Sequence, residues 1–192
     1  MRWPRDHDEG DLIVSEMDNV IPALVAAVQK QHAVGDHYRE EVIRQAMEHQ
    51  VQLALQPGTV RVDVVVYPQW SDGQINSVQV VMYDRPFLVD TVVSCLLKHG
   101  WRVEDVRHPI IGVKRDCNTI ETVGVPGRGG CAPESWIHID VTAPLGADIA
   151  QAAEQLRDDL CACLDQVVRA TDDWGAMHEA MLRTAELVSA SQ

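Results

Sequence analysis

The sequence has 192 residues, which is enough for one domain with a sizeable core plus a helical appendage. Its net charge of -13 argues against nucleic acid or an anionic membrane as a partner. No apolar run approaches the ~18 residues of a membrane span, and the N-terminus has no apolar signal core. The five cysteines show no framework spacing, which is typical of reduced thiols. We therefore expect a cytoplasmic protein with no membrane partner.

Two helical patterns come first. Apolar residues at helical spacing cover residues 13–28, with Pro22 inside the run. A second pattern follows Asp36 as N-cap and stops at Pro57. Together they predict an antiparallel helical hairpin in residues 1–55.

Two strands and a helix come next. Residues 59–67 and 78–83 alternate with period two, so we expect two antiparallel strands. After Asp84 the period becomes helical, and the apolar stripe continues to Lys98. Gly100 supplies a left-handed stop.

The second half contains two more predicted strands and two more helices. Residues 102–115 predict a strand that Pro109 confines to an edge or a bulge. A Gly-rich loop is expected over residues 117–133. Residues 134–143 alternate again, with Ile137, Ile139 and Val141 predicted inward and Trp136, His138 and Asp140 outward. Long amphipathic helices follow to the end. A strand, a crossing helix and a strand begin a ferredoxin-like unit.

Short phrases within these elements resemble a known family. YDRPFLVDTV resembles the first strand, loop and helix of ACT domains, small modules that often bind amino acids and regulate metabolic enzymes. In order, PGTVRVDVVVYP, DRPFLVDTV, HPIIGVKRD and ESWIHIDV are similar to the N-terminal region of the large bacterial NAD-dependent glutamate dehydrogenases. The resemblance covers residues 56–174.

Together with the elements, the resemblance implies an α+β fold. We expect a ferredoxin-like (ACT-like) four-stranded antiparallel sheet with helices on one face, preceded by the N-terminal helical hairpin and followed by a C-terminal helix. The expected divisions are a helical segment at 1–55, an ACT-like domain at 56–171 and a helical extension at 172–192. The early strand at 59–67 is expected to fill the sheet edge that the last strand fills in standard ACT modules.

The resemblance also implies a role. The parent enzyme would oxidatively deaminate L-glutamate to 2-oxoglutarate and ammonium with NAD, in a separate dehydrogenase domain. This chain would then be a non-catalytic N-terminal segment without a cofactor of its own. Its partners would be other domains and subunits of a homo-oligomer, with a free amino acid as an effector. The alternative is a free-standing amino-acid-binding module, and an enzyme in its own right is the least favoured reading.

The turn formed by Asp84, Arg85, Pro86 and Phe87 is the main candidate site. A helix N-terminus after a strand presents free N–H groups that suit a carboxylate. In ACT modules that bind amino acids, a Gly usually stands where Phe87 stands. Phe87 is therefore expected to fill the ligand space, which favours a packing or interface role over ligand binding.

Other candidate residues carry weaker signals. Asp90 is interpreted as a solvated or capping carboxylate, and Trp101 and Trp136 as outward aromatics that could anchor an interface. The spacing of the histidines and cysteines matches no structural zinc pattern, so we expect no metal site; the residues considered are His108, Cys117, Cys131 and His138. No nucleophile motif is present, and the GVPGRGG segment lacks the strand and helix of a dinucleotide site.

Overall fold

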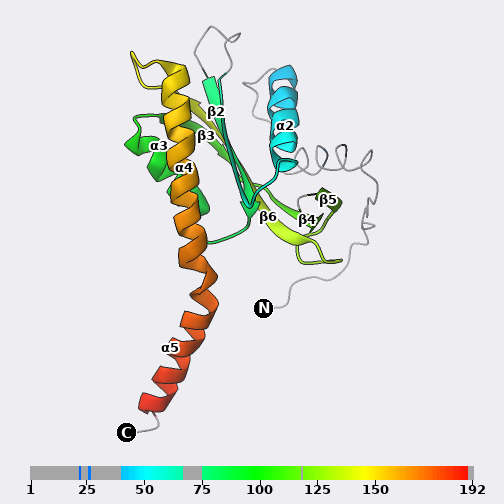
Figure 1. Ribbon diagram of the computed structural model, residues 1–192, viewed down its shortest axis with the longest axis vertical. Helices are drawn as coiled ribbons and strands as arrows, with labels where there is room; N and C mark the ends of the chain where they lie inside the picture. Colours follow the sequence, from blue (N-terminus) through cyan, green and yellow to red (C-terminus); the bar gives the residue numbers. More distant parts are fainter. Residues whose placement is uncertain (1–21, 23–25, 27–39, 67–74, 118, 190–192) are drawn as a thin grey trace, which may run out of the picture. The chain divides into compact units, whose positions relative to one another are not determined.

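The computed structural model describes residues 22, 26, 40–66, 75–117 and 119–189. Along the chain (Figure 1) the elements are α2 (Glu40–Ala54), β1 (Val60–Val65), β2 (Ile75–Tyr83), α3 (Leu88–Lys98), β3 (Arg102–Arg107), β4 (Ile110–Asp116), β5 (Thr119–Gly124), β6 (Ala132–Thr142), α4 (Ile149–Asp172) and α5 (Trp174–Ser189). Helix α2 is the second helix of the expected hairpin. The first helix falls outside the described residues, so the hairpin stays a prediction.

The chain forms two compact units. One comprises Met1–Pro57 with Pro109–Glu134, and the other comprises Gly58–His108 with Ser135–Gln192. The second unit contains the candidate turn and the helices α3, α4 and α5.

The sheet has six strands, so the expected count of four is wrong. Its order is β1-β2-β6-β4-β5, and β3 also pairs with β6. The difference arises where one long strand was expected over residues 102–115. Pro109 has no N–H to donate and interrupts that strand, which divides into β3 and β4.

The second extra strand lies in the expected Gly-rich loop. β5 pairs antiparallel with β4, with Val113 opposite Val123. The residues of β5 alternate with period two, but the glycines that follow them made the whole segment resemble a loop. The irregular segment is reduced to the connection between β5 and β6, which is closed into a turn by hydrogen bonds from Gly127 N to Cys131 O (2.8 Å) and from Cys131 N to Arg128 O (2.9 Å).

The early strand has the expected place at the edge of the sheet. β1 is antiparallel to β2, with Val62 opposite Val80, and it ends the strand order. Both strands consist largely of valine on the side that faces the core, which suits a pleated surface packed against helices.

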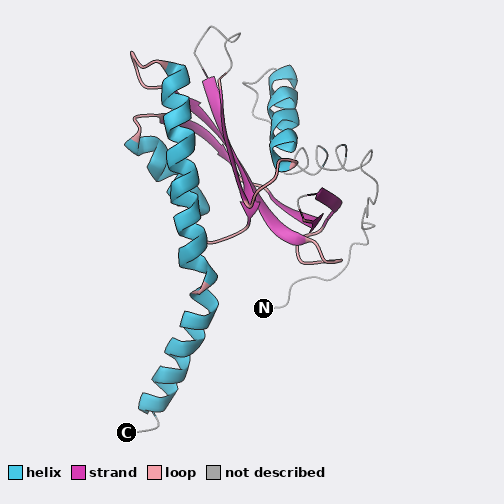
Figure 2. Cartoon of the chain, viewed as in Figure 1, coloured by secondary structure: helices cyan, strands magenta, loops and turns pink. Residues whose placement is uncertain are grey.

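The core of the second unit lies between one face of the sheet and the helices α3 and α4 (Figure 2). Asp148 caps α4, because its carboxylate accepts hydrogen bonds from the N–H groups of Ala150 (3.1 Å) and Gln151 (3.3 Å). The helices contribute residues at helical spacing, including Leu88, Val92, Leu96, Leu156, Leu160 and Leu164. Ile137, Ile139 and Val141 are fully buried against them, which confirms their inward assignment.

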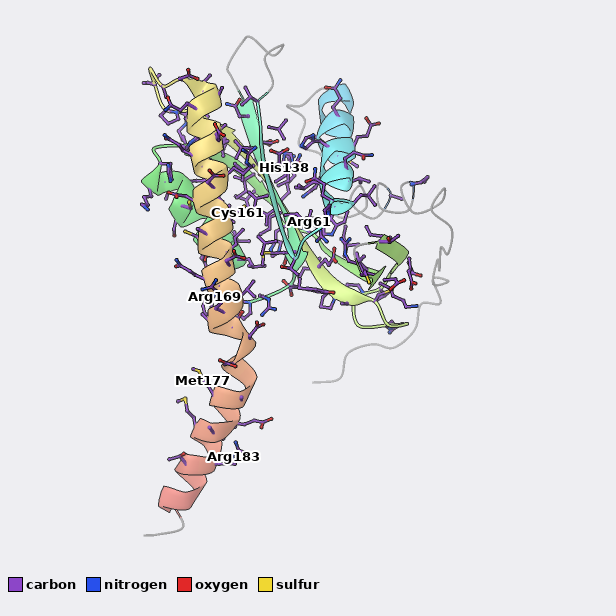
Figure 3. All side chains as sticks on the ribbon, in the orientation of Figure 1. Arg61, His138, Cys161, Arg169, Met177 and Arg183 are labelled. Atoms are coloured by element: carbon purple, nitrogen blue, oxygen red, sulfur yellow. The ribbon has the colours of Figure 1, made fainter. Side chains whose placement is uncertain are left out.

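The opposite face of β6 is also buried, so the outward assignment of its alternate residues is wrong. Trp136, His138 and Asp140 are only 0%, 4% and 5% exposed. His138 (Figure 3) hydrogen-bonds Gln79 on β2 at 3.3 Å and Asp140 at 3.0 Å. Arg107 on β3 donates to the same Asp140 carboxylate. Period-two alternation separates the faces of a strand, but polar residues on one face do not establish its exposure.

In the first unit, a buried ion pair joins the β4–β5 hairpin to the start of β6. Arg115 binds the Glu134 carboxylate through two nitrogens, at 2.6 and 2.9 Å. A third nitrogen of the same guanidinium donates to the carbonyl oxygen of Ala54, the last residue of α2. Arginine suits this role because its planar fork of donors can serve several acceptors at once.

Helix α5 follows a short break at Asp173 (Figure 2). Several of its apolar side chains are exposed, among them Met177, Met181 and Leu182. None of the helices in the described part of the chain has an apolar stretch long enough to cross a membrane.

We expect Leu160→Ala to lower the free energy of unfolding by about 2–5 kcal/mol, because it leaves a cavity under α4 in the middle of the core. Chemical denaturation of the purified chain measures this loss. Leu145→Ala is the matched control, because Leu145 is fully exposed and its truncation should change stability by less than about 0.5 kcal/mol. Equal losses from the two substitutions would contradict the described core.

Candidate functional site

The turn between β2 and α3 places four candidate residues together. Phe87 is the N-cap residue of α3, with φ 71 and ψ 8, and its side chain makes no capping hydrogen bond. The first intrahelical bond runs from Thr91 N to Phe87 O at 3.0 Å. The Asp84 carboxylate accepts a hydrogen bond from Ser135. The first-turn N–H groups of α3 therefore receive no side-chain cap from Phe87.

Asp84 begins a chain of hydrogen bonds across three strands. Ser135 on β6 donates its hydroxyl proton to the Asp84 carboxylate at 2.6 Å. His108, just after β3, lies 2.9 Å from the Ser135 oxygen through Nε2. Because the only hydroxyl proton is used toward Asp84, Nε2 of His108 carries the proton and donates to Ser135. The chain therefore runs from His108 to Ser135 to Asp84.

This order does not activate the serine. A nucleophilic serine needs a base that accepts its proton, with the carboxylate behind that base. Here the imidazole nitrogen that faces Ser135 donates, and the serine proton is held by Asp84. Ser135 is also fully buried. The three residues stabilise the junction of the strands and the turn.

Burial lowers the pKa of His108 below its ordinary value of 6.5, and the Asp84 carboxylate partly opposes this effect. The neutral imidazole is thus the form that the fold favours.

Arg85 connects the turn to the end of α4. Its Nη1 atom lies 3.1 Å from the Thr171 hydroxyl and 2.5 Å from the Asp172 carboxylate. The Thr171 hydroxyl in turn donates to the carbonyl oxygen of Val167 at 2.7 Å. A cation at the C-terminal end of a helix also interacts favourably with the helix dipole. The turn is held from both sides, by β6 through Asp84 and by α4 through Arg85.

Phe87 does not fill the space beside the turn as expected. Its side chain is 59% exposed, and the nearby Tyr83 is 42% exposed. The left-handed backbone of a bulky L-residue costs roughly 1–2 kcal/mol, and burial of the ring does not offset that cost here. Pro86 is also exposed. The turn thus presents aromatic surface to the solvent from a strained position.

The remaining predicted residues are dispersed. Asp90 is exposed on the first turn of α3 and lines a groove on that helix. Trp101 and Trp136 are 1% and 0% exposed, so their outward position is wrong: Trp101 belongs to the core of the second unit, and Trp136 lies on the buried second face of β6. Indole rings of this size are often buried, and the alternation around Trp136 does not reveal that its face of β6 is covered.

The histidines considered as metal ligands are in separate networks. His108 hydrogen-bonds Ser135, whereas His138 hydrogen-bonds Gln79 and Asp140. Among the residues that the structure describes, no three His, Cys, Asp or Glu side chains gather in a way that could hold a metal ion.

The sequence reasoning missed Ser135 and the network around His138. A signal was available, because His138 and Asp140 alternate with isoleucines on a strand. Buried polar residues of this kind require partners on neighbouring strands. The partners themselves could not be found without the strand register, which places Arg107 opposite His138.

We expect the free energy of unfolding to fall as the pH drops through about 6.5, the pKa of an unperturbed His, because the unfolded chain then binds a proton that folded His108 resists. His108→Gln should remove this part of the pH dependence. Urea denaturation across pH 5–8 measures it, with His178→Gln on exposed α5 as the control. Identical pH profiles for the original chain and His108→Gln would contradict the assignment.

Comparison with known proteins identifies the family. The chain matches the family described as glutamate dehydrogenase, ACT1 domain, over residues 25–160. No curated protein matches it. The matched residues include the turn, Ser135 and His108, and they make up well over half of the sequence. The mixed fold, with an antiparallel β1–β2 pair, an antiparallel β3–β6 pair and helices α3 and α4 on the sheet, is consistent with an ACT-like domain. The chain belongs to the glutamate dehydrogenase ACT1 domain family.

Proposed function

We propose that this chain is a non-catalytic regulatory and assembly domain of a large NAD-dependent glutamate dehydrogenase. The parent reaction would convert L-glutamate, NAD and water to 2-oxoglutarate, ammonium and NADH. Family membership supports the link to glutamate dehydrogenase. NAD would be bound elsewhere in the parent enzyme, since this chain offers no dinucleotide motif.

One observation supports the assembly role: the charged groups of the turn already have partners within the chain, while its aromatic ring is largely exposed. Asp84 is engaged by Ser135, and Arg85 is engaged by Thr171 and Asp172. The Phe87 ring projects into solvent from a strained backbone. Strain of this kind persists where the surrounding structure or a function requires it. An exposed aromatic held rigidly on a turn is suited to contact another domain or subunit.

The hydrogen-bond order around Ser135 supports the non-catalytic part of this proposal. Ser135 is a buried serine with hydrogen bonds to both a histidine and a carboxylate, and its proton is directed away from the histidine. A domain of this kind would act on the parent enzyme through contacts. To regulate, it would have to favour one conformational state of the enzyme over another.

Amino-acid sensing is the second candidate, and it also has an observation in its favour. The Nε atom of Arg85 is buried and makes no hydrogen bond within the described residues. Phe87 provides no side-chain cap for the first turn of α3. A bound carboxylate could accept hydrogen bonds from Arg85 Nε and from the first-turn N–H groups of α3. Charge-assisted hydrogen bonds of both kinds are strong. Such a ligand would first have to compete with the Asp172 carboxylate.

We expect no free amino acid at millimolar concentration to raise the midpoint of thermal unfolding by more than about 1 °C. A ligand at 100 times its dissociation constant would add about 2.7 kcal/mol, which such a measurement detects easily. Sodium acetate and ammonium chloride at matched ionic strength serve as controls. A dose-dependent rise with one amino acid that Arg85→Gln abolishes would favour the sensor instead.

We expect the chain to self-associate, and Phe87→Ser to raise the dissociation constant about tenfold or more, because burial of a Phe side chain contributes about 1.5–3 kcal/mol. Sedimentation equilibrium over a range of chain concentrations measures this. Leu97→Ser is the matched control, since Leu97 is similarly exposed, at 61%, on the adjacent helix α3. A monomer at all concentrations, or equal effects of the two substitutions, would contradict assembly through this turn.

A further inference from the structure

Two cysteines meet where α3 packs against α4. Cys95 on α3 is 5% exposed and belongs to the core, whereas Cys163 on α4 is partly buried at its edge. Both line one open surface groove of about 330 Å³, together with Asp90, Thr91, Ser94 and Lys98. Neither forms a disulfide in this structure. Two thiols from different helices thus share one solvent-accessible space.

The two thiols are in direct contact. The pKa of Cys95 is raised to about 11. Burial is the largest cause, and the charge of Cys163 and a hydrogen bond between the two side chains also contribute. The hydrogen bond favours the protonated form of Cys95, as burial does. At neutral pH Cys95 is a protonated thiol that faces the sulfur of Cys163.

We propose that Cys95 and Cys163 form a thiol-oxidation site, which a hydroperoxide converts into a disulfide that joins α3 to α4. The inference rests on the contact and on the open groove, and it holds whether or not the chain regulates a dehydrogenase. It requires an oxidant of small size, because Cys95 is only 5% exposed.

The chemistry needs one equivalent of hydroperoxide. The Cys163 thiolate attacks the peroxide oxygen, the O–O bond breaks, and the leaving alkoxide or hydroxide takes up a proton, which leaves a sulfenic acid on Cys163. The Cys95 sulfur then attacks the Cys163 sulfur, its proton goes to the departing hydroxide, and water leaves. The two thiols together lose two electrons. The hydroperoxide is reduced to water and an alcohol, or to two waters when it is hydrogen peroxide.

The other cysteines lack this arrangement. Cys161 is two residues from Cys163 on the same helix (Figure 3), so it points to a different face, and it is not among the groove residues. Burial raises the pKa of its thiol as well. Cys161 therefore shares the helix, the partial burial and the chemistry of Cys163 but lacks its partner. It is the natural control.

The disulfide would change the part of the domain that holds the turn. α3 begins directly after Phe87, and the end of α4 binds Arg85. A covalent link between the two helices fixes their packing and closes a long loop of chain, which restricts the unfolded state. Oxidation should thus stabilise the second unit and stiffen the support of the turn.

The test treats the purified full chain with hydrogen peroxide at one to ten equivalents, followed by alkylation and peptide mass spectrometry without reductant. We expect one crosslinked species in which the Cys95 and Cys163 peptides are joined with the loss of two hydrogens. The midpoint of thermal unfolding should rise by about 5–10 °C, and dithiothreitol should reverse both changes. Cys161→Ser should behave like the original chain.

Cys163→Ala and Cys95→Ser should both lose the crosslink and the thermal shift. Cys163→Ala keeps the test valid if Cys95→Ser fails to fold, because Cys163 lies at the edge of the core. Oxidation of Cys163 to sulfenic or sulfinic acid without a crosslink would overturn the proposal. So would a dominant crosslink that includes Cys117 or Cys161, or a crosslink that forms only between two chains.

Discussion

Burial of both faces of β6 is the constraint on which the rest of the second unit depends. One face is apolar and packs under α3 and α4, where each fully buried aliphatic side chain contributes about 1.5–3 kcal/mol. The other face is polar, and His138 and Asp140 are stable there because neighbouring strands supply hydrogen bonds. A buried polar group without a partner costs about 1–3 kcal/mol, so the register of β6 against β3 is specified strongly.

The same strand supports the turn. Ser135 lies at its start and joins Asp84 to His108, and on the other side Arg85 reaches the end of α4. The turn is therefore fixed by a strand and a helix that lie far apart in the sequence. This support explains how Phe87 can keep a left-handed backbone while its ring remains exposed. Rigid presentation of an aromatic ring lowers the entropic cost of a contact, which is why this geometry favours assembly.

Two opposite demands meet at this site. A sensor would keep its charged groups available for a ligand, whereas a structural turn uses them internally. Asp84 follows the second pattern, and Arg85 does so through Nη1, while its buried Nε makes no hydrogen bond within the described residues. The disulfide that we propose between Cys95 and Cys163 would fix the packing of the two helices that support the turn. Regulation through this domain would then act on the mobility of α3 and α4.

The sequence by itself determined the α+β class, the helix that follows Asp84, the inward isoleucines of β6 and the family, because these depend on local periodicity and short phrases. It also indicated an early strand at the sheet edge. Only the tertiary structure decided that the sheet has six strands, that Trp101 and Trp136 are buried, and that Phe87 is exposed. Alternation distinguishes two faces of a strand without revealing whether each is covered. The partners of Ser135, Arg85 and Cys95 come from distant segments, and only the folded chain brings those segments together.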